Sequence, residues 1–249
     1  MRYDEPPAGY VRFSVGTARV VCLEHLADSL KTALGGDTLY GYASRHPTAR
    51  AIAGRGPVFA VRLPGDEETV VVRHNRHGGL LARFTRDLFQ SPTRAPFELR
   101  VSEQLRSLDV PTPRVACYVT YPAFAGIERA DVATQEIAHS EDLAVGLMSG
   151  DVGIRNRALK AASLLVGLLG RAKARHHDLN VKNILLSAER EGEPTALVLD
   201  VDRVEFLTDG MQATEANLER LLRSARKWQT MHHAPVTDTE LEVFAGAAR

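Results

Sequence analysis

The sequence predicts an α+β protein of two lobes, with a small antiparallel sheet in the first lobe and a reduced, mainly helical second lobe. Two observations lead to this prediction. The first half of the 249-residue chain is dominated by β-branched runs and turn residues, and the second half by apolar residues at helical spacing. We expect a single domain whose lobes span about residues 1–136 and 137–249.

Composition and charge exclude several classes of protein. Hydrophobic residues make up 44% and charged residues 25%, as in ordinary globular proteins. Cys22 and Cys117 form no CxxC pair, so neither a disulfide framework nor a zinc site is expected. The zero net charge argues against nucleic acid as a partner. We expect a cytoplasmic protein without a signal peptide or transmembrane segment, because the longest apolar run, residues 161–170, is too short.

Four strands are expected in the first lobe. Residues 58–64 and 68–74 are β-branched runs on either side of a turn that contains Gly65, which predicts an antiparallel hairpin. Residues 115–123 and 131–137 are expected to add two further strands.

Three helices are expected around these strands. Residues 96–108 begin with proline and carry an apolar stripe with Glu98 beside it, whereas Glu103 projects from another face as a solvated acid. Residues 154–174 predict a long amphipathic helix in the second lobe. Residues 214–231 predict a charged helix with two alternatives: it lies on a membrane surface, or it packs on the second lobe.

A loop after the long helix carries the clearest chemical motif. Residues 176–183 read HHDLNVKN, which has the form H-x-D-x-x-x-x-N of a kinase catalytic loop. This spacing lets one acid reach an acceptor hydroxyl while an amide five residues later reaches a magnesium ion. Asp178 is therefore the expected catalytic base and Asn183 a metal ligand, with His176 as a structural brace.

A second oxygen ligand for Mg²⁺ is expected at Asp200. It follows the apolar strand of residues 196–199, where kinases carry Asp-Phe-Gly, and Asp202 is a neighbouring acid. The order of long helix, catalytic loop and acid-terminated strand makes ATP and Mg²⁺ the expected cofactors.

The first lobe supplies the candidates for nucleotide binding. Gly54 and Gly56 would allow the backbone to approach ATP phosphates, the alternative being a simple turn before a strand. Arg73 ends the second hairpin strand and is the candidate cation for the phosphates, with Glu98 holding it. Most kinases use lysine at that position.

A basic segment follows Arg73. Residues 73–86, RHNRHGGLLARFTR, contain four arginines and two histidines and no acid. Such a segment suits phosphate or carboxylate groups, and the alternative is a solvated basic face. Arg76 and His77, together with Asn180 of the catalytic loop, are the expected substrate-binding residues.

Taken together, these motifs resemble the lipopolysaccharide kinases, and most closely the 3-deoxy-D-manno-octulosonic acid (Kdo) kinases. The resemblance spans about residues 54–227 and implies transfer of the ATP γ-phosphate to a hydroxyl of a Kdo sugar on a lipid A precursor. It also implies a peripheral protein on the cytoplasmic face of the inner membrane of a Gram-negative bacterium. The stretches that carry it are GRG at 54–56, VVRHNRHGGL at 71–80, FELRVSEQL at 97–105, HHDLNVKNILL at 176–186, LDVDR at 199–203 and NLERLLRSARK at 217–227.

The chain departs from the family pattern at three positions. Asn75 and Val201 stand where the family commonly has an aromatic residue, and His77 replaces the second basic residue of the patch. Arg73 has two possible roles, nucleotide binding or substrate binding, because a shift of one residue moves a side chain to the opposite face of a strand.

Three other functions compete with this one. A protein Ser/Thr kinase usually has lysine two residues after the catalytic Asp, where this chain has Asn180, and no Ala-Pro-Glu segment follows Asp200. A soluble kinase for a sugar or an antibiotic usually has an acidic pocket, whereas the basic segment favours an anionic acceptor. A pseudokinase would lack the intact Asp178, Asn183 and Asp200, and Mg²⁺-dependent ATP binding would distinguish it.

Overall fold

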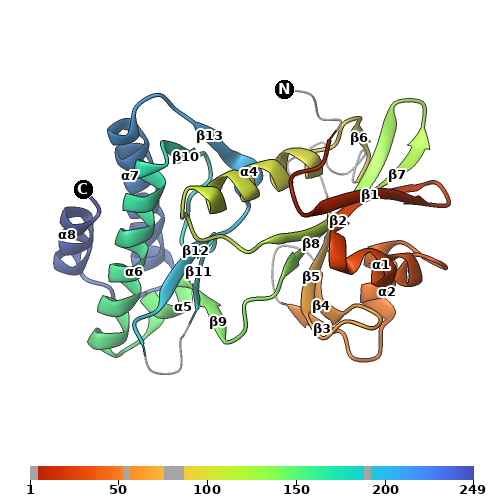
Figure 1. Ribbon diagram of the computed structural model, residues 1–249. Coiled ribbons are helices and arrows are strands. Elements are labelled where there is room, and N and C mark those ends of the chain that lie inside the picture. The colour runs from red at the N-terminus through yellow and green to blue at the C-terminus, as the bar shows by residue number, and fades with distance from the viewer. Residues whose placement is uncertain (1–4, 53–56, 76–86, 188–191) are drawn as a thin grey trace. The chain divides into compact units, whose positions relative to one another are not determined.

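The computed structural model describes residues 5–52, 57–75, 87–187 and 192–249 (Figure 1). The chain forms two compact units. Met1–Glu103 and Arg114–Glu136 belong to the first unit, and Gln104–Pro113 and Ile137–Arg249 belong to the second. The segment Gln104–Pro113 therefore packs with the second unit although it lies between two segments of the first.

The first unit is built on an antiparallel sheet. Its strand order is β1-β2-β7-β8-β5-β4-β3, and β6 pairs with β8 beside this path. Each pairing is antiparallel, as expected from the sequence. The strands are β1 (Tyr10–Val15), β2 (Ala18–Leu23), β3 (Arg50–Ile52), β4 (Val58–Arg62), β5 (Thr69–His74), β6 (Phe89–Gln90), β7 (Val115–Phe124) and β8 (Ile127–Gln135).

The predicted hairpin is present as β4 and β5. Phe59 pairs with Val72 and Arg62 with Thr69, and Gly65 occupies the turn with a φ of 75°, a conformation that glycine adopts without strain. Val70 and Val72 are buried in the core. Because side chains alternate along a strand, Arg73 lies on the face opposite to these two valines.

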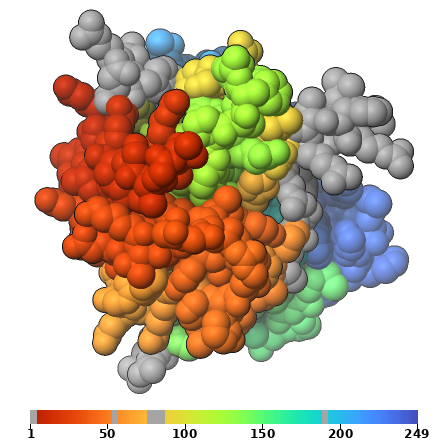
Figure 2. All heavy atoms as spheres, turned by 90° about the vertical axis from the view of Figure 1, so that its right-hand side faces the viewer, coloured from red at the N-terminus to blue at the C-terminus, as the bar shows by residue number. Residues whose placement is uncertain are grey.

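The N-terminal elements were not predicted from the sequence. They are the β1–β2 hairpin, a short 3₁₀ helix η1 (Glu24–Leu26), and the helices α1 (Ala27–Ala33) and α2 (Leu39–Arg45). Helix α2 packs against β4 and β5, and its first turn is capped by the Thr38 hydroxyl, which accepts a hydrogen bond from the Gly41 amide. The segments before residue 50, red and orange in Figure 2, form a continuous surface on one face of the first unit.

The second unit is mainly helical. Helix α6 packs against α5, α7 and α8, and the pair α6 and α7 run side by side in Figure 1. Two small antiparallel sheets, β10-β13 and β12-β11-β9, lie beside these helices. The helices are α5 (Leu143–Met148), α6 (Val152–Arg171), α7 (Gly210–Met231) and α8 (Asp238–Ala247). The strands are β9 (Ser140–Asp142), β10 (Ala174–His176), β11 (Ile184–Ser187), β12 (Thr195–Val198) and β13 (Val204–Phe206), and a 3₁₀ helix η2 (Val201–Arg203) separates β12 from β13.

The structure decides between the two alternatives for the helix expected at 214–231. Helix α7 begins earlier, at Gly210, after Asp209 caps it, and its Leu218 and Leu221 are both 1% exposed. This apolar face packs within the second unit, mainly against α6. The packing alternative is therefore correct. No helix among the residues that the structure describes is long and apolar enough to cross a bilayer.

The expectation that Glu103 is a solvated acid was wrong. Helix α4 (Ala95–Ser107) places the Glu103 carboxylate 3.1 Å from the Tyr10 hydroxyl, which donates a hydrogen bond to it. Arg114 Nε lies 3.4 Å from the same carboxylate. Helical spacing alone misses these partners, because both lie outside the helix, and Tyr10 lies in a segment distant in the sequence.

We predict that Gly210→Ala lowers the free energy of unfolding by about 1–3 kcal/mol, the usual cost of overpacking. A Cβ atom at Gly210 would lie 2.6 Å from the backbone oxygen of Gly170, where α6 and α7 approach closely. Gly246→Ala is the matched control, because nothing lies within 4 Å of a Cβ atom there. Urea unfolding of both variants tests this, and equal stability of the two would contradict it.

Candidate active site

The predicted catalytic loop joins β10 to β11 in the second unit. Asp178 lies in this loop, Asn183 ends it, and Asp200 follows β12, the strand that pairs with β11. The antiparallel pairing of β11 with β12 brings the two ends that carry Asn183 and Asp200 together. The Leu199 amide donates a 2.9 Å hydrogen bond to the Asn183 carbonyl oxygen.

His176 braces this loop from inside. Its ring is fully buried; Nδ1 accepts a 3.1 Å hydrogen bond from the Asp178 amide, and Nε2 lies 2.9 Å from the Leu199 carbonyl oxygen. These partners require a neutral ring with its proton on Nε2. Burial lowers the pKa of His176, which favours the same neutral form.

The side chains of Asn183 and Asp200 are oriented by the backbone around them. Asn183 Nδ2 donates a 2.9 Å hydrogen bond to the Asp178 carbonyl oxygen, which turns its Oδ1 atom the other way. Asp200 has a φ of 52°, a left-handed conformation that non-glycine residues seldom adopt and that often marks functional positions. Its side chain is exposed, whereas Asn183 is 9% exposed.

Asn180, an expected substrate-binding residue, makes its contacts inside the loop. Its Nδ2 donates to the Asp178 carbonyl oxygen and its Oδ1 accepts from the Lys182 amide, both at 2.9 Å. These two hydrogen bonds fix the orientation of the side chain and leave one N–H of Nδ2 and one lone pair of Oδ1 for other contacts.

Helix α7 contributes three residues whose roles were not predicted from the sequence. Asn217 is fully buried; its Oδ1 accepts from the His176 amide and its Nδ2 donates to the Ala174 carbonyl oxygen. Ser224 accepts a hydrogen bond from the Val181 amide at 3.2 Å. Arg220 Nη2 lies 3.6 Å from Asp178 Oδ1. The spacing i, i+3, i+7 places all three on one face of the helix, and this spacing was the available signal.

The first unit contains the predicted pair of Arg73 and Glu98. Arg73 Nη2 on β5 forms an ion pair and hydrogen bond with Glu98 Oε1 on α4, and Glu98 is 4% exposed. Arg73 Nη1 also lies 3.3 Å from Asn75 Oδ1. In protein kinases, a strand cation and a helix glutamate pair in this way around the nucleotide phosphates. The four remaining predicted residues, Gly54, Gly56, Arg76 and His77, lie outside the described residues.

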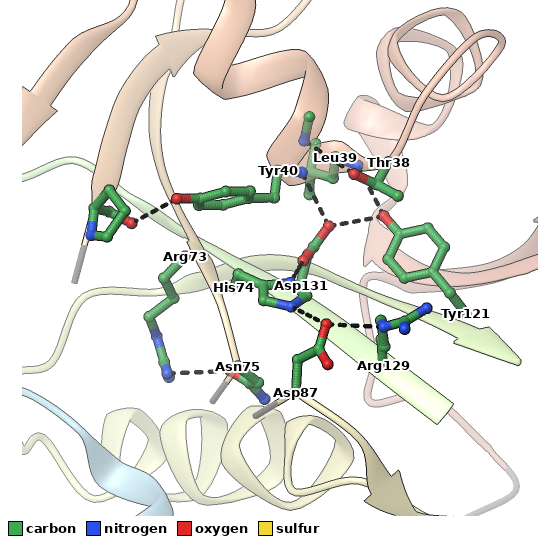
Figure 3. A network of polar contacts seen from close by, with 12 residues as sticks. Thr38, Leu39, Tyr40, Arg73, His74, Asn75, Asp87, Tyr121, Arg129 and Asp131 are labelled. Atoms are coloured by element: carbon green, nitrogen blue, oxygen red, sulfur yellow. Dashed lines mark hydrogen bonds and ion pairs between the residues drawn. The ribbon is translucent and has the colours of Figure 1, made fainter. Parts of the chain in front are cut away.

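A buried polar network stands beside this pair (Figure 3). Asp131 on β8 is fully buried, and its Oδ1 lies 2.6 Å from Nδ1 of His74, the last residue of β5. The other oxygen accepts hydrogen bonds from the Tyr121 hydroxyl and the Tyr40 amide, each at 2.9 Å. His74 Nε2 lies 3.1 Å from Asp87 Oδ2, so the second residue of the basic segment meets the residue that directly follows the segment.

Both ring nitrogens of His74 thus face carboxylates, and the imidazolium form satisfies both contacts. The hydrogen bond to Asp131 raises the pKa of His74, although burial opposes this. Burial would raise the pKa of Asp87, but His74 and Arg129 lower it overall. The network therefore favours a charged His74 between two carboxylates.

We predict a pH-dependent contribution of His74 to stability. A raised pKa in the folded state means that the contribution is fully present below the unfolded pKa of about 6.5 and is lost as the pH rises through the folded pKa. The difference in unfolding free energy between wild type and His74→Gln should be largest at acidic pH. Thermal unfolding at a series of pH values measures this difference, and His25→Gln, at an exposed position, is the control. A difference that grows as the pH rises would contradict a charged His74.

Asn217→Ala should destabilise the second unit and slow catalysis. The change leaves two backbone groups of β10 without their side-chain partner, at a cost of about 2–4 kcal/mol. Gln212→Ala, at an exposed position of the same helix, is the control. Chemical denaturation measures the cost, and an unfolding free energy equal to that of the control would show that Asn217 does not brace the loop.

The sheet-based first unit, the helical second unit and the H-x-D-x-x-x-x-N loop define a protein-kinase-like phosphotransferase. A model of the lipopolysaccharide kinase (Kdo/WaaP) family matches residues 55–244, and the chain belongs to this family. The predicted resemblance, the kinase activity and the role in lipopolysaccharide core biosynthesis are thus confirmed.

Relatives and a solved structure support the same assignment. Proteins named 3-deoxy-D-manno-octulosonic acid kinase from Xanthomonas campestris pv. campestris (strain B100) and Xylella fastidiosa (strain M12) are 32% and 30% identical over 184 and 189 residues. These alignments cover 70% and 73% of this chain, and 68% and 70% of the relatives. The relative from Vibrio vulnificus (strain YJ016) is 28% identical over 191 residues, 75% of this chain and 76% of its own. The solved structure of WaaP in complex with acyl carrier protein has a TM-score of 0.58 at 17% identity, covering 92% of this chain and 88% of that one, and confirms the fold class.

Proposed function

We propose that this protein transfers the γ-phosphate of ATP to a hydroxyl of a Kdo sugar on a lipid A precursor. The observation that carries the proposal is the braced loop. The Asp178 amide donates to His176, the Asp178 carbonyl oxygen accepts from Asn183, and the Leu199 amide donates to Asn183. The Kdo acceptor is inferred from relatives that are named Kdo kinases and span more than two thirds of the chain.

Asp178 acts in this proposal as the general base. Its side chain is 47% exposed, so an acceptor hydroxyl can reach the carboxylate. The carboxylate accepts the hydroxyl proton as the sugar oxygen attacks the γ-phosphorus, and ADP leaves.

Asn183 and Asp200 fit the requirements of a Mg²⁺ site. Mg²⁺ prefers oxygen ligands and is usually held by one or two protein oxygens together with nucleotide phosphates. The Asn183 amide oxygen and the exposed Asp200 carboxylate supply such oxygens, and the Leu199–Asn183 hydrogen bond keeps their backbones together. The metal, when bound, neutralises phosphate charge, while Asn183 and Asp200 hold it.

Nucleotide and acceptor contacts are assigned to the first unit. Arg73, oriented by Glu98, binds the nucleotide phosphates, and Gly54 and Gly56 cover them. Arg76 and His77 belong to the basic segment, which suits the carboxylate of Kdo and the phosphates of lipid A. Because that acceptor is a membrane lipid, we further propose that the protein works peripherally on the cytoplasmic face of the inner membrane.

A transfer assay tests the acceptor directly. Purified protein, Mg²⁺ and γ-labelled ATP are incubated with Kdo-bearing lipid A precursor, with the same lipid lacking Kdo, and with a generic protein substrate. Label on the Kdo-bearing lipid alone is the expected result. Equal label on both lipids, or label on the protein, would contradict the Kdo assignment. Label on no acceptor, with ATP binding intact, would direct the search to a soluble sugar or antibiotic.

Substitution of the two acids should separate their roles. Asp178→Asn should lower kcat by about 10²- to 10⁴-fold with little change in ATP affinity, because it removes the base. Asp200→Asn should instead weaken Mg²⁺-dependent ATP binding. Asp209→Asn is the control, since asparagine also caps the exposed start of α7. Calorimetric ATP titrations and steady-state rates measure both effects, and near-normal turnover by Asp178→Asn would exclude it as the base.

A further inference from the structure

The lysine of the catalytic loop, Lys182, pairs with groups other than Asp178. The loop has Asn180 where protein kinases usually have lysine, and both ends of that side chain bond within the loop. Lys182 Nζ pairs with Asp142 at 2.8 Å and lies 5.2 Å from the centre of the Trp228 ring. Phosphoryl transfer requires positive charge at the transferred group, so any side-chain cation that assists the metal beside Asp178 must come from outside the loop.

Arg220 of α7 brings a guanidinium to that place. Its Nη2 is 3.6 Å from Asp178 Oδ1. Asn217 and Ser224, one turn before and one turn after it, hydrogen-bond the loop and fix the helix against it. The Arg220 Nε atom is buried and has no acceptor among the residues that the structure describes, although the side chain as a whole is 34% exposed. The Nε atom is thus enclosed, while Nη2 lies beside the partly exposed carboxylate of Asp178.

The ion pair with Asp178 does not by itself explain why the Arg220 guanidinium lies beside the catalytic loop. A separation of 3.6 Å is too long for a hydrogen bond, and pairs between partly exposed groups contribute little to stability. A guanidinium has five donors in a planar fork, and this geometry matches the oxygens of a phosphoryl group. Arg220 is therefore better suited to a group that arrives beside Asp178 than to Asp178 alone.

We propose that Arg220 is a catalytic residue that binds the transferred phosphoryl group, in the role of the lysine that protein kinases carry in the loop. This rests on the proposed role of Asp178 as the base. The sugar oxygen forms a bond to the γ-phosphorus, the bond from that phosphorus to the bridging oxygen of ADP breaks, and Asp178 takes the hydroxyl proton. Arg220 donates hydrogen bonds to the oxygens of the group in transfer and stabilises their charge.

Steady-state kinetics of Arg220→Gln test the proposal, with Arg223→Gln as control. Arg223 lies on the same helix, is exposed and pairs with Glu219. Arg220→Gln should lower kcat by about 10²- to 10³-fold, as loss of a transition-state donor does, while KM for ATP and for the acceptor stay within about threefold. Arg220→Lys should retain part of kcat, and Arg223→Gln all of it.

A double variant tests whether the charge can come from the loop. Adding Asn180→Lys to Arg220→Gln should restore at least about tenfold in kcat, because it returns a cation to the neighbourhood of Asp178. Thermal unfolding checks each variant. If Arg220→Gln does not fold, Arg220→Met, which keeps the apolar stem, carries the same expectation.

Two results would overturn the proposal. A kcat within about threefold of wild type in the folded variant would show that Arg220 does not act in transfer. A rise in KM for the acceptor with kcat unchanged would assign Arg220 to binding an anionic group of the acceptor. ATP hydrolysis without acceptor is measured in parallel. If wild-type protein hydrolyses ATP but leaves the Kdo-bearing lipid unlabelled, the acceptor proposal fails, and Arg220 is then judged by the hydrolysis rate.

Discussion

The buried imidazole of His176 holds together the two segments of the second unit that carry the proposed catalytic base and a proposed metal ligand. One ring nitrogen accepts from the amide of Asp178, and the other lies at hydrogen-bond distance from the carbonyl oxygen of Leu199, the residue before Asp200. The proposed base and a proposed metal ligand therefore share one anchor. Both contacts need the neutral ring, and burial lowers the pKa of His176 in that direction.

Helix α7 extends this arrangement from the loop into the core of the unit. Asn217 bonds the backbone of β10 on both sides of Arg175, Ser224 bonds the loop, and the start of the helix packs closely on Gly170 of α6. Because phosphoryl transfer depends mainly on positioning and charge, a loop held at several points favours rapid chemistry. Helix α7 also carries Arg220, the cation that we propose acts beside Asp178.

Much of this structure could be predicted from local sequence patterns. The β-branched runs at 58–64 and 68–74, on either side of the turn glycine, correspond to β4 and β5, and the helical stripes at 96–108 and 154–174 correspond to α4 and α6. The contact between Arg73 and Glu98 also followed from the kinase pattern.

The contacts that were not predicted join residues far apart in the sequence. Periodicity identifies the buried face of α7 but not the loop that it meets, more than 40 residues earlier in the chain for Asn217 and Ser224. The same reason explains the missed pair of His74 and Asp131, 57 residues apart, and the error at Glu103.

The protonation state of His176 tests the account most directly. Nitrogen-15 NMR of the labelled protein reports the tautomer and charge of each histidine, and His176→Gln assigns the signal. We predict a neutral ring with the proton on Nε2 at neutral pH, and a pKa below the ordinary histidine value of about 6.5. A pKa at or above about 6.5, or a proton on Nδ1 at neutral pH, would contradict the shared anchor, because a protonated Nδ1 cannot accept the hydrogen bond from the Asp178 amide.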